Sequence, residues 1–399
     1  MSASNEDGTG LLAGIRVVDV THMLAGPYCT WVLASMGAEV IKVERPGSGD
    51  FTRGLAPFHE GESVYFMSVN RGKESLTLDL KDPRGKEAFR RLAATCDILV
   101  ENNRAGAMDR LGLGYDDLAA DHPGLIYASI SGFGQTGPYR NRPAFDAIAQ
   151  GLSGMMSITG EEGGPPCRVG ASIGDIGASL FGAVGILAAL QRRQHTGQGA
   201  RLDVAMLDCQ LALMENAVAR YATLGLEPRA LGSRHPLVVP FQAFPTADRP
   251  IAVCVDTDAQ WQRLCAVLGR PDLLADPRFA EGNARGQHHG DLEPLLIDAF
   301  AGHGRDHWLA VLDAADVPSS PINSVAEALA DPQVVSRGMV RESPEGSGRR
   351  FVGLPVHVDG AAPAAQRPAP QLGAQGEALL AALGYDAPAI AAMRRDGVI

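Results

Sequence analysis

Short apolar segments alternate with helix-length segments over the first 131 residues, and this alternation restricts the fold more than any other feature. The apolar segments, rich in Val, Ile and Leu, occupy 14–19, 38–44, 75–80, 97–101 and 125–131. Helices are predicted between them at 26–36 and 83–94. Strands that alternate with helices pair in parallel, because each crossover returns the chain to the same edge of the sheet. The chain is therefore predicted to be an α/β protein with a mainly parallel sheet.

The central part of the chain predicts two further helices. Residues 176–194 are apolar or small on nearly all sides, which is typical of a buried helix. Glycines at 197 and 199 end this segment, and residues 205–224 predict the next helix. We expect both helices to belong to a large Rossmann-like domain that spans 1–225.

Beyond about residue 225 the pattern changes, and a smaller α+β domain is predicted over 226–325. Strands are expected there at 241–245 and 250–256. The last part of the chain, about 326–399, is expected to complete the large domain and to end in a helix over 377–395.

The net charge of -11 argues against nucleic acid as a partner, because neutralising phosphates needs clustered Lys and Arg. The six cysteines form no C-x-x-C pair, so neither a disulfide framework nor a zinc site is expected. Residues 1–10 lack the apolar core of a secretory signal, and no apolar run reaches about 18 residues. We therefore expect a cytoplasmic protein without a metal and without a membrane partner.

The segment 132–137 (GFGQTG) matches the glycine pattern of dinucleotide-binding proteins and follows a predicted strand. That pattern binds a pyrophosphate only where it opens a helix, and Pro138 and Pro143 oppose a helix here. The first strand-to-helix turn, 21–27 (THMLAGP), lacks the glycine pattern. No G-K-[ST] phosphate loop occurs. A nucleotide-dependent oxidoreductase is therefore the less favoured alternative.

Asp175 stands in the segment Gly174–Gly177 (GDIG), directly before the predicted buried helix. An aspartate there can simply cap the helix, since it accepts hydrogen bonds from the first amides. The glycines also leave the backbone bare, so a ligand can approach the carboxylate closely. The positive end of the helix is expected to keep the carboxylate ionised, as a nucleophile requires. A cap and a nucleophile are both open roles for Asp175 on this basis.

Several segments resemble the family III CoA-transferases (the CaiB/BaiF family), which include formyl-CoA, crotonobetainyl-CoA and succinyl-CoA dicarboxylate transferases. Their order and spacing match over almost the whole chain. The segments are LAGP at 24–27, GAEVIKVERPGSGD at 37–50, NRGK at 70–73, VEN at 100–102, GLGYDDL at 112–118, SGFGQTGP at 131–138, GDIGASLFG at 174–182 and TGQGARLDVAMLD at 196–208. The resemblance implies an interlocked homodimer, in which each chain threads through a ring formed by the other.

The resemblance places the catalytic aspartate at Asp175. It implies CoA contacts at the ends of strands and in the following turns, at Arg45, Leu78, Asn102, Asn103, Ala107 and Arg110. Arginines suit the phosphates of CoA because the guanidinium offers a fixed fork of donors. The implied reaction passes through an aspartyl anhydride and an aspartyl-CoA thioester, with acyl-CoA and carboxylates as substrates and no other cofactor.

The α-methylacyl-CoA racemases share this fold and are the main alternative activity. Their pattern has a histidine directly before the aspartate that corresponds to Asp146, where this chain has Phe145. Phenylalanine cannot transfer a proton, which argues against racemisation. The chain also has Leu24 where formyl-CoA transferase has glutamine, and it lacks a glycine run near 255–260. Both differences argue against oxalate and formyl-CoA as substrates.

The segment 232–244 is similar to the succinyl-CoA–glutarate type of transferase. Arg234 and His235 are expected either to bind the distal carboxylate of a dicarboxylic acid or to cap a loop between domains. Leu24 and Phe145 are expected beside the substrate. Succinyl-CoA with a small dicarboxylate is the expected substrate pair. A CoA-binding protein without catalytic activity is a further alternative, which the presence of Asp175 opposes.

Overall fold

The computed structural model describes residues 10–343, 345–361 and 367–399. Residues 1–9, on which the prediction about a secretory signal rests, lie outside this part. The chain forms two compact units. The first contains the described residues up to Met156, Arg168–Leu226 and Pro332–Ile399, and the second contains Ser157–Cys167 and Glu227–Asp331. The structure thus joins 157–167 to the second unit, whereas the sequence pattern assigned this segment to the large domain.

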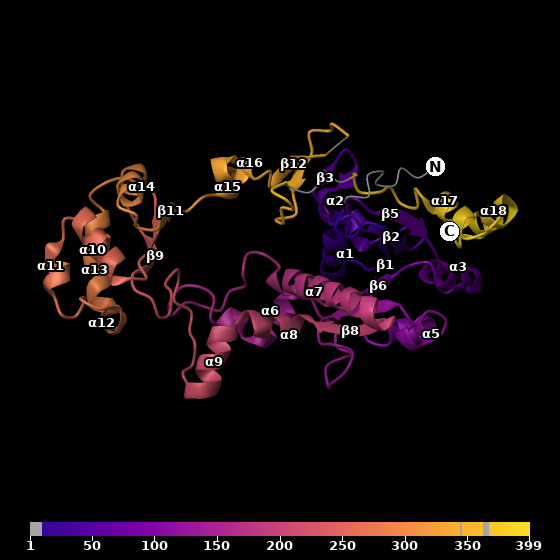
Figure 1. The fold of residues 1–399 in the computed structure, drawn as a ribbon, viewed down its shortest axis with the longest axis horizontal. Coiled ribbons are helices and arrows are strands. Elements are labelled where there is room, and N and C mark those ends of the chain that lie inside the picture. Colours follow the sequence, from indigo (N-terminus) through magenta and orange to yellow (C-terminus); the bar gives the residue numbers. More distant parts are fainter. Residues whose placement is uncertain (1–9, 344, 362–366) are drawn as a thin grey trace. The chain divides into compact units, whose positions relative to one another are not determined.

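Six parallel strands form the sheet of the first unit, in the order β5-β2-β1-β6-β7-β8 (Figure 1). They are β1 (Arg16–Val20), β2 (Glu39–Glu44), β5 (Glu74–Thr77), β6 (Ile98–Glu101), β7 (Ile126–Ser131) and β8 (Ala200–Ala205). Five of them match predicted segments, and β8 does not. This edge strand carries exposed Arg201 and Asp203, so it lacks the continuous apolar run of the central strands.

The strand order reverses between β1 and β6. From β1 the chain continues outward through β2 to β5, and from β6 it continues through β7 to β8 on the other side. Loops diverge at such a switch point, and ligands of open α/β sheets bind there, beyond the carboxyl ends of the strands. The turns after Val20 and after Glu101 therefore border the place where a ligand is expected.

Helices cover both faces of this sheet. Val17 and Ile98 belong to one core, and their neighbours Val18 and Leu99 belong to another. The cores are separate because successive side chains of a strand point to opposite faces. The first core contains α1 (Ala25–Ser35) and α7 (Ile173–Thr196), and the second contains α3 (Pro83–Ala93), α5 (Tyr115–Ala119), α17 (Gly376–Ala382) and α18 (Ala387–Arg395).

The helix α7 begins three residues before the predicted start at 176 and ends at Thr196, and the next residue, Gly197, has a φ of 69° that suits a glycine cap. Among the described residues it is the one helix with the length and mean hydropathy (1.8) to cross a membrane, and half of its apolar stretch is buried. It packs against α1, α8, β7 and β8, as a core helix does.

Two predicted helices are each interrupted in the structure. The segment 205–224 divides into α8 (Met206–Leu213) and α9 (Glu215–Leu224), with Met214 outside the helical region. The segment 377–395 divides into α17 and α18 around Gly384, which has a φ of 88°. The break at Met214 separates a helix that packs against α7 from one that does not, since α8 contacts α7 whereas no residue of α9 is buried.

Shorter elements complete the first unit: η1 (Phe51–Gly54), β3 (Phe58–His59), β4 (Glu62–Ser63), α2 (Val64–Asn70), α4 (Ala107–Arg110), α6 (Asp146–Ser153), η2 (Met155–Ser157), α16 (Pro332–Ser336), β12 (Val340–Glu342) and β13 (Arg350–Val352). The last residue of η2, Ser157, already belongs to the second unit.

The second unit is a small α+β structure with an antiparallel sheet of β11 (Ser319–Pro321), β10 (Ile251–Cys254) and β9 (Phe241–Phe244). Its helices are α10 (Asp258–Val267), α11 (Pro271–Ala275), α12 (Gly282–Gln287), α13 (His289–Phe300), α14 (Arg305–Ala314) and α15 (Val325–Ala330). Phe244, Trp261 and Phe300 anchor its own apolar core. The predicted strands at 241–245 and 250–256 correspond to β9 and β10.

Candidate functional site

Asp175 lies in the first turn of α7, at its third residue. Because α7 leads back into the parallel strand β8, its first turn lies at the carboxyl edge of the sheet. The residue before the helix is Ser172, so Asp175 is not the cap that the sequence left open as its role. Among the described residues no hydrogen bond or ion pair engages its carboxylate. The carboxylate is thus available for other chemistry.

Asp146, the first residue of α6, lies beside this turn. Its Oδ1 accepts a hydrogen bond from the amide of Gly174 (2.8 Å), and its Oδ2 accepts one from Gln150 Nε2 (2.8 Å). Arg168 Nη2 is 3.5 Å from the same Oδ2. The amide of Gly174 is therefore already bound and is not free to serve a developing oxyanion.

The pKa of the Asp175 carboxyl is raised to about 7. Burial is the larger cause and the negative charge of Asp146 is the second, since both disfavour the ionised form. The expectation that the helix end keeps Asp175 ionised is therefore wrong, because burial and Asp146 raise the pKa by more than the helix end lowers it. A helix end favours the ionised carboxylate by about 0.3–1 kcal/mol. The rise of the pKa from 3.8 to about 7 is about three tenfold changes in the ionisation constant, and each of these corresponds to about 1.4 kcal/mol.

Gly174 permits the close approach of α7 to α6 and α8. A Cβ at this position would lie 2.4 Å from Gln210 Nε2 and 3.0 Å from Asp146 Oδ1. We expect Gly174→Ala to lower the unfolding free energy by about 1–3 kcal/mol, because buried Gln210 must move, and to reduce activity. Thermal unfolding and an activity assay test this.

Gly185→Ala is the matched control on the same helix. Its Cβ would meet only Leu202 Cδ1, at 3.6 Å, an ordinary contact. Alanine should stabilise the helix there by about 0.5–1 kcal/mol relative to glycine. Equal effects of the two variants would contradict the steric argument at Gly174.

Asn102 bridges the switch point between β1 and β6. Its side-chain oxygen accepts a hydrogen bond from the amide of His22 (2.9 Å), and its Nδ2 donates to the carbonyl of His22 (2.7 Å). This side chain, predicted to contact CoA, therefore also holds the turn after β1 in place. Asn103 follows it, and its amide donates to Glu101 Oε2 (2.8 Å).

The other predicted CoA contacts also lie at this edge of the sheet. Arg45 follows β2 and is exposed, and Ala107 and Arg110 begin and end the short helix α4 after β6. Leu78 follows β5, but its side chain is 1% exposed and belongs to the core. A contact of Leu78 with a ligand would therefore have to come from its backbone.

Two predicted substrate residues belong to the first unit. Leu24 directly precedes α1 and is half-buried. Phe145 directly precedes α6 and is 64% exposed. Each precedes a helix that starts beside the beginning of α7, since Ala25 is hydrogen-bonded to Ser179 in the second turn of α7 and Asp146 to Gly174 in its first turn.

Arg234 and His235 belong to the second unit. Arg234 donates to His289 Nδ1 (2.8 Å) and to Glu162 Oε2 (3.0 Å). His235 Nδ1 accepts hydrogen bonds from the amides of residues 237 and 238, and its ring stacks on Phe241. Within this unit both side chains thus stabilise loops, and their predicted action on a distal carboxylate stays a prediction.

The structure also shows site residues that the sequence did not indicate. Tyr65 on α2 has a pKa raised to about 12, first by burial and then by the negative charge of Asp175. Its phenol therefore lies within the electrostatic reach of the carboxylate. Gln210 on α8 is fully buried against Gly174, and its Nε2 has no hydrogen-bond partner in the described chain. Both come from segments distant in sequence, and no local motif marks them.

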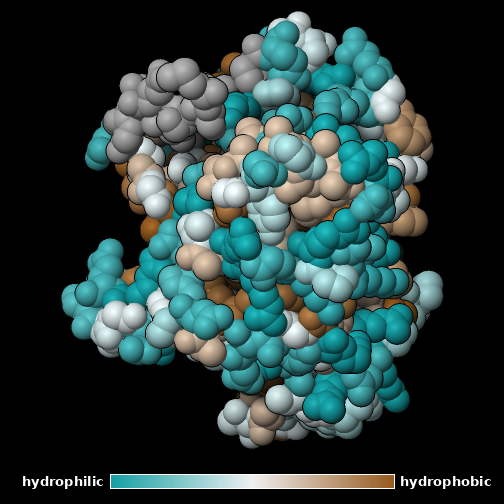
Figure 2. Space-filling model, turned by 90° about the vertical axis from the view of Figure 1, so that its right-hand side faces the viewer, coloured by the Kyte–Doolittle hydropathy of each residue, from teal (hydrophilic) through white to brown (hydrophobic). Residues whose placement is uncertain are grey.

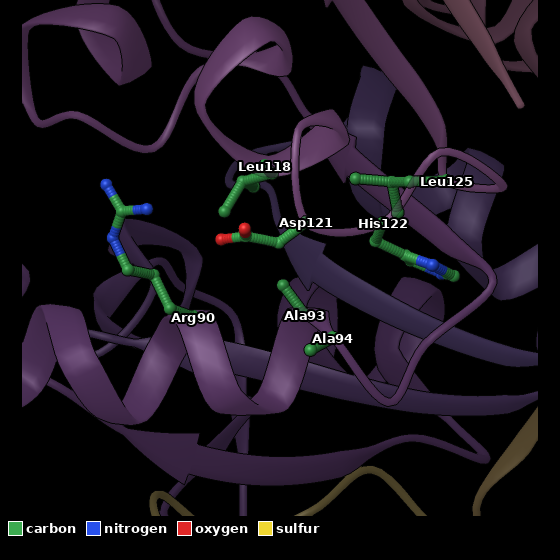
Figure 3. Close-up of a pocket in the computed structure, with 7 residues that line it drawn as sticks. All are labelled: Arg90, Ala93, Ala94, Leu118, Asp121, His122 and Leu125. Carbon is green, nitrogen blue, oxygen red and sulfur yellow. The ribbon is translucent and has the colours of Figure 1, made fainter.

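A pocket lies at the opposite edge of the sheet. Figure 3 shows it lined by Arg90, Ala93 and Ala94 of the α3 end, Leu118 of α5, and Asp121, His122 and Leu125. Leu125 directly precedes β7, so this pocket is at the amino ends of the strands. It contains none of the residues discussed above. Among the described residues no three His, Cys, Asp or Glu side chains cluster as metal ligands would.

The structure is thus an α/β protein with a parallel sheet and a switch point. A half-buried carboxylate without a partner in the described chain lies at the carboxyl edge of this sheet, where open α/β sheets bind ligands. The model of CoA-transferase family III matches residues 12–376, and the chain belongs to this family. It is thus a family III CoA-transferase, as the sequence resemblance indicated.

Named relatives agree with this assignment. An acetyl-CoA:oxalate CoA-transferase of Acetobacter aceti is 43% identical and is covered to 95%, with 93% of this chain matched. A succinyl-CoA:glutarate CoA-transferase of Mus musculus is 40% identical, with 85% of this chain and 78% of the relative matched. A CaiB/BaiF family protein of Brucella suis has a similar structure, with a TM-score of 0.83, 37% identity, and 93% and 98% coverage.

Proposed function

We propose that this protein transfers CoA from an acyl-CoA donor to a small carboxylic acid, with Asp175 as the residue that is acylated. The observation that carries the proposal is the position of Asp175. Its carboxylate lies at the carboxyl edge of the sheet, half-buried and without a hydrogen-bond partner in the described chain. A nucleophile of this kind divides one difficult exchange into easier steps.

The proposed steps conserve atoms and charge. A carboxylate oxygen of Asp175 attacks the donor thioester carbon, the C–S bond breaks, and CoA leaves as the thiolate. The thiolate then attacks the Asp175 carbonyl of the resulting anhydride, which releases the donor acid and leaves an aspartyl-CoA thioester. The acceptor carboxylate displaces CoA from this thioester, and the thiolate finally takes the acceptor acyl group. Water must be excluded, because it would hydrolyse the anhydride.

The polar edge beside β1, β2 and β6 is the proposed CoA site, with Arg45, Asn102, Asn103, Ala107 and Arg110 as its residues. Arg45 and Arg110 are exposed there, and a guanidinium binds phosphate through paired hydrogen bonds. No cofactor besides CoA and its thioesters is required by the steps above. A cytoplasmic location remains part of the proposal.

A dicarboxylic acid is the proposed acceptor and succinyl-CoA the proposed donor. Relatives named for succinyl-CoA with glutarate, mesaconate or citramalate support this choice. The relative named for acetyl-CoA and oxalate returns oxalate to the set of candidates, although Leu24 argued against it. Arg234 and His235 are proposed to bind the second carboxylate of such an acid.

We further propose that the protein acts as a homodimer. Figure 2 shows a mainly hydrophilic surface on the side of α3, α5 and α18. The helix α9, by contrast, has no buried residue, and its large apolar side chains Tyr221 and Leu224 are 56% and 66% exposed. Val184 on α7 is 63% exposed. A helix with an uncovered apolar face is stabilised by a partner surface, and a second copy of the chain would provide it.

A panel of donors and acceptors tests the proposal. Succinyl-CoA and acetyl-CoA are each mixed with glutarate, mesaconate, oxalate or acetate, and new thioesters are identified by mass spectrometry. We expect transfer from succinyl-CoA to at least one dicarboxylate, by a species with twice the chain mass of 41.9 kDa. Absence of every new thioester would contradict the proposed activity, and a monomeric mass would contradict the dimer.

A further inference from the structure

The turn 21–27, which leads from the end of β1 into the first residues of α1, is held mainly by side chains from other segments. Thr21 donates its amide to Asp19 Oδ1 (2.9 Å), and its carbonyl accepts from Lys42 Nζ (2.8 Å). Asn102 binds both backbone groups of His22. The carbonyl of Pro27 accepts from Lys73 Nζ (3.0 Å). Backbone groups near both ends of the turn are thus bound to buried ammonium groups.

The two lysines are fully buried and paired with carboxylates. Lys73 Nζ is 2.9 Å from Asp19 Oδ2, and Lys42 Nζ is 2.9 Å from Asp50 Oδ2. All four side chains have 0% exposure. Buried ion pairs contribute little net stability, because desolvation of the charges offsets their attraction. What they do provide here is a fixed place for the carbonyl groups they bind.

The conformation of the turn also requires support. Met23 has a φ of 66°, in the left-handed region that a side chain disfavours. Gly26 packs so tightly that a Cβ would lie 2.4 Å from the Thr21 side chain. A strained turn of this kind persists only where its surroundings fix it.

One side chain connects this turn to the helix of Asp175. Ser179 Oγ lies 2.6 Å from the carbonyl of Ala25 and 2.7 Å from the carbonyl of Asp175, and Ser179 is fully buried. Its hydroxyl hydrogen is shared between the start of α1 and the first turn of α7. A displacement of the turn would therefore pass to the backbone that carries the nucleophile.

We infer that Lys73 and Ser179 are positioning residues, which fix the Asp175 backbone against the turn 21–27 and so aim its carboxylate at the bound thioester. This inference rests on the proposed function of Asp175. Displacement of a reacting group by about 1 Å can cost about 100-fold in rate. Neither residue needs to touch the substrate for this effect.

The test separates acylation from binding. Ser179→Ala is expected to slow the formation of acyl-Asp175 by about 10–100-fold in single-turnover mass spectrometry, with the dissociation constant of CoA changed less than about threefold. Ser35→Ala is the matched control, because Ser35 Oγ donates only to Trp31 four residues earlier, at the other end of α1. It should acylate at the native rate.

A second variant keeps the test valid if Ser179→Ala folds poorly. Lys73→Met combined with Asp19→Asn removes both charges of one pair and leaves neither unpaired. Its acylation should also slow by about 10-fold or more with CoA affinity retained. Native acylation rates in both variants would overturn this inference but would not contradict the proposed function. If the unaltered protein forms no acyl-Asp175 with any acyl-CoA, the proposed function fails and the inference with it.

Discussion

Asp175→Ala is expected to lower steady-state CoA transfer by about 10⁴-fold or more, because the variant lacks the carboxylate on which the proposed anhydride forms. Asp146 is the neighbouring candidate, but its two oxygens are bound to Gly174 and Gln150. The affinity for CoA should change little, since the proposed CoA contacts lie in other loops. Transfer is measured by mass spectrometry of the thioester products, and CoA binding by calorimetry.

Asp208→Ala is the matched control for this prediction. Asp208 also occupies the first turn of a helix in the same unit, and it is exposed. Its loss should leave transfer within about twofold of the native rate. Hydroxylamine trapping after incubation with an acyl-CoA should modify residue 175 in the native protein and in the Asp208 variant. Full activity of Asp175→Ala would remove the basis of the proposed mechanism.

The rate of Asp175 acylation is expected to fall about tenfold for each pH unit below about 7. Only the ionised carboxylate attacks the thioester, and the pKa of Asp175 is raised to about 7 by burial and by Asp146. At pH 5 about 1% of such a group is ionised, so acylation should be about 100-fold slower than at its plateau. Single-turnover rates between pH 5 and pH 8.5 measure this dependence.

Asp146→Asn identifies the second cause of the raised pKa. Removing the negative charge should lower the pKa of Asp175. The acidic limb of the plot of acylation rate against pH should then move to lower pH by about one unit. Asn retains an oxygen that can accept from the amide of Gly174, so the local geometry should persist. An unchanged profile in this variant would show that Asp146 does not act on the ionisation of Asp175.

The pH dependence of unfolding gives an independent test of the raised pKa of Asp175. A carboxyl with a folded pKa of about 7 and an ordinary value of 3.8 binds its proton more tightly in the folded state. The contribution of this group to stability should therefore fall as the pH rises from about 4 to about 7. Asp175→Asn should lack this part of the loss, which thermal unfolding at pH 5 and pH 8 will detect.

Local patterns predicted much of the first unit. The apolar segments ending at Asp19, Glu44 and Glu101 indicated central parallel strands, because strands buried on both faces need continuous apolar runs. Edge strand β8 escaped prediction, since Arg201 and Asp203 are exposed and interrupt its apolar run. The division of 205–224 into two helices also depends on packing against α7, which no local pattern expresses.

The candidate site was predicted in part. The GDIG segment and the family resemblance indicated Asp175, which the structure places at the carboxyl edge of the sheet, and the predicted CoA contacts stay predictions at the same edge. The state of the carboxyl was not predicted correctly, because it depends on Asp146, 29 residues earlier in the chain. Tyr65 and Gln210 were missed for the same reason, as each approaches the first turn of α7 only in the folded chain.

The amino-acid sequence by itself determined the parallel α/β class, the order of the central strands and helices, and the residue expected to carry the acyl group. These follow from short-range periodicity and from a motif that is contiguous along the chain. Only the tertiary structure decided the raised pKa of Asp175, the binding of the Gly174 amide, and the hydrogen bonds that join Lys73 and Ser179 to the turn 21–27 and to the backbone of Asp175. Each of these depends on desolvation or on contacts across more than twenty residues, and such energies exist only after the chain has folded.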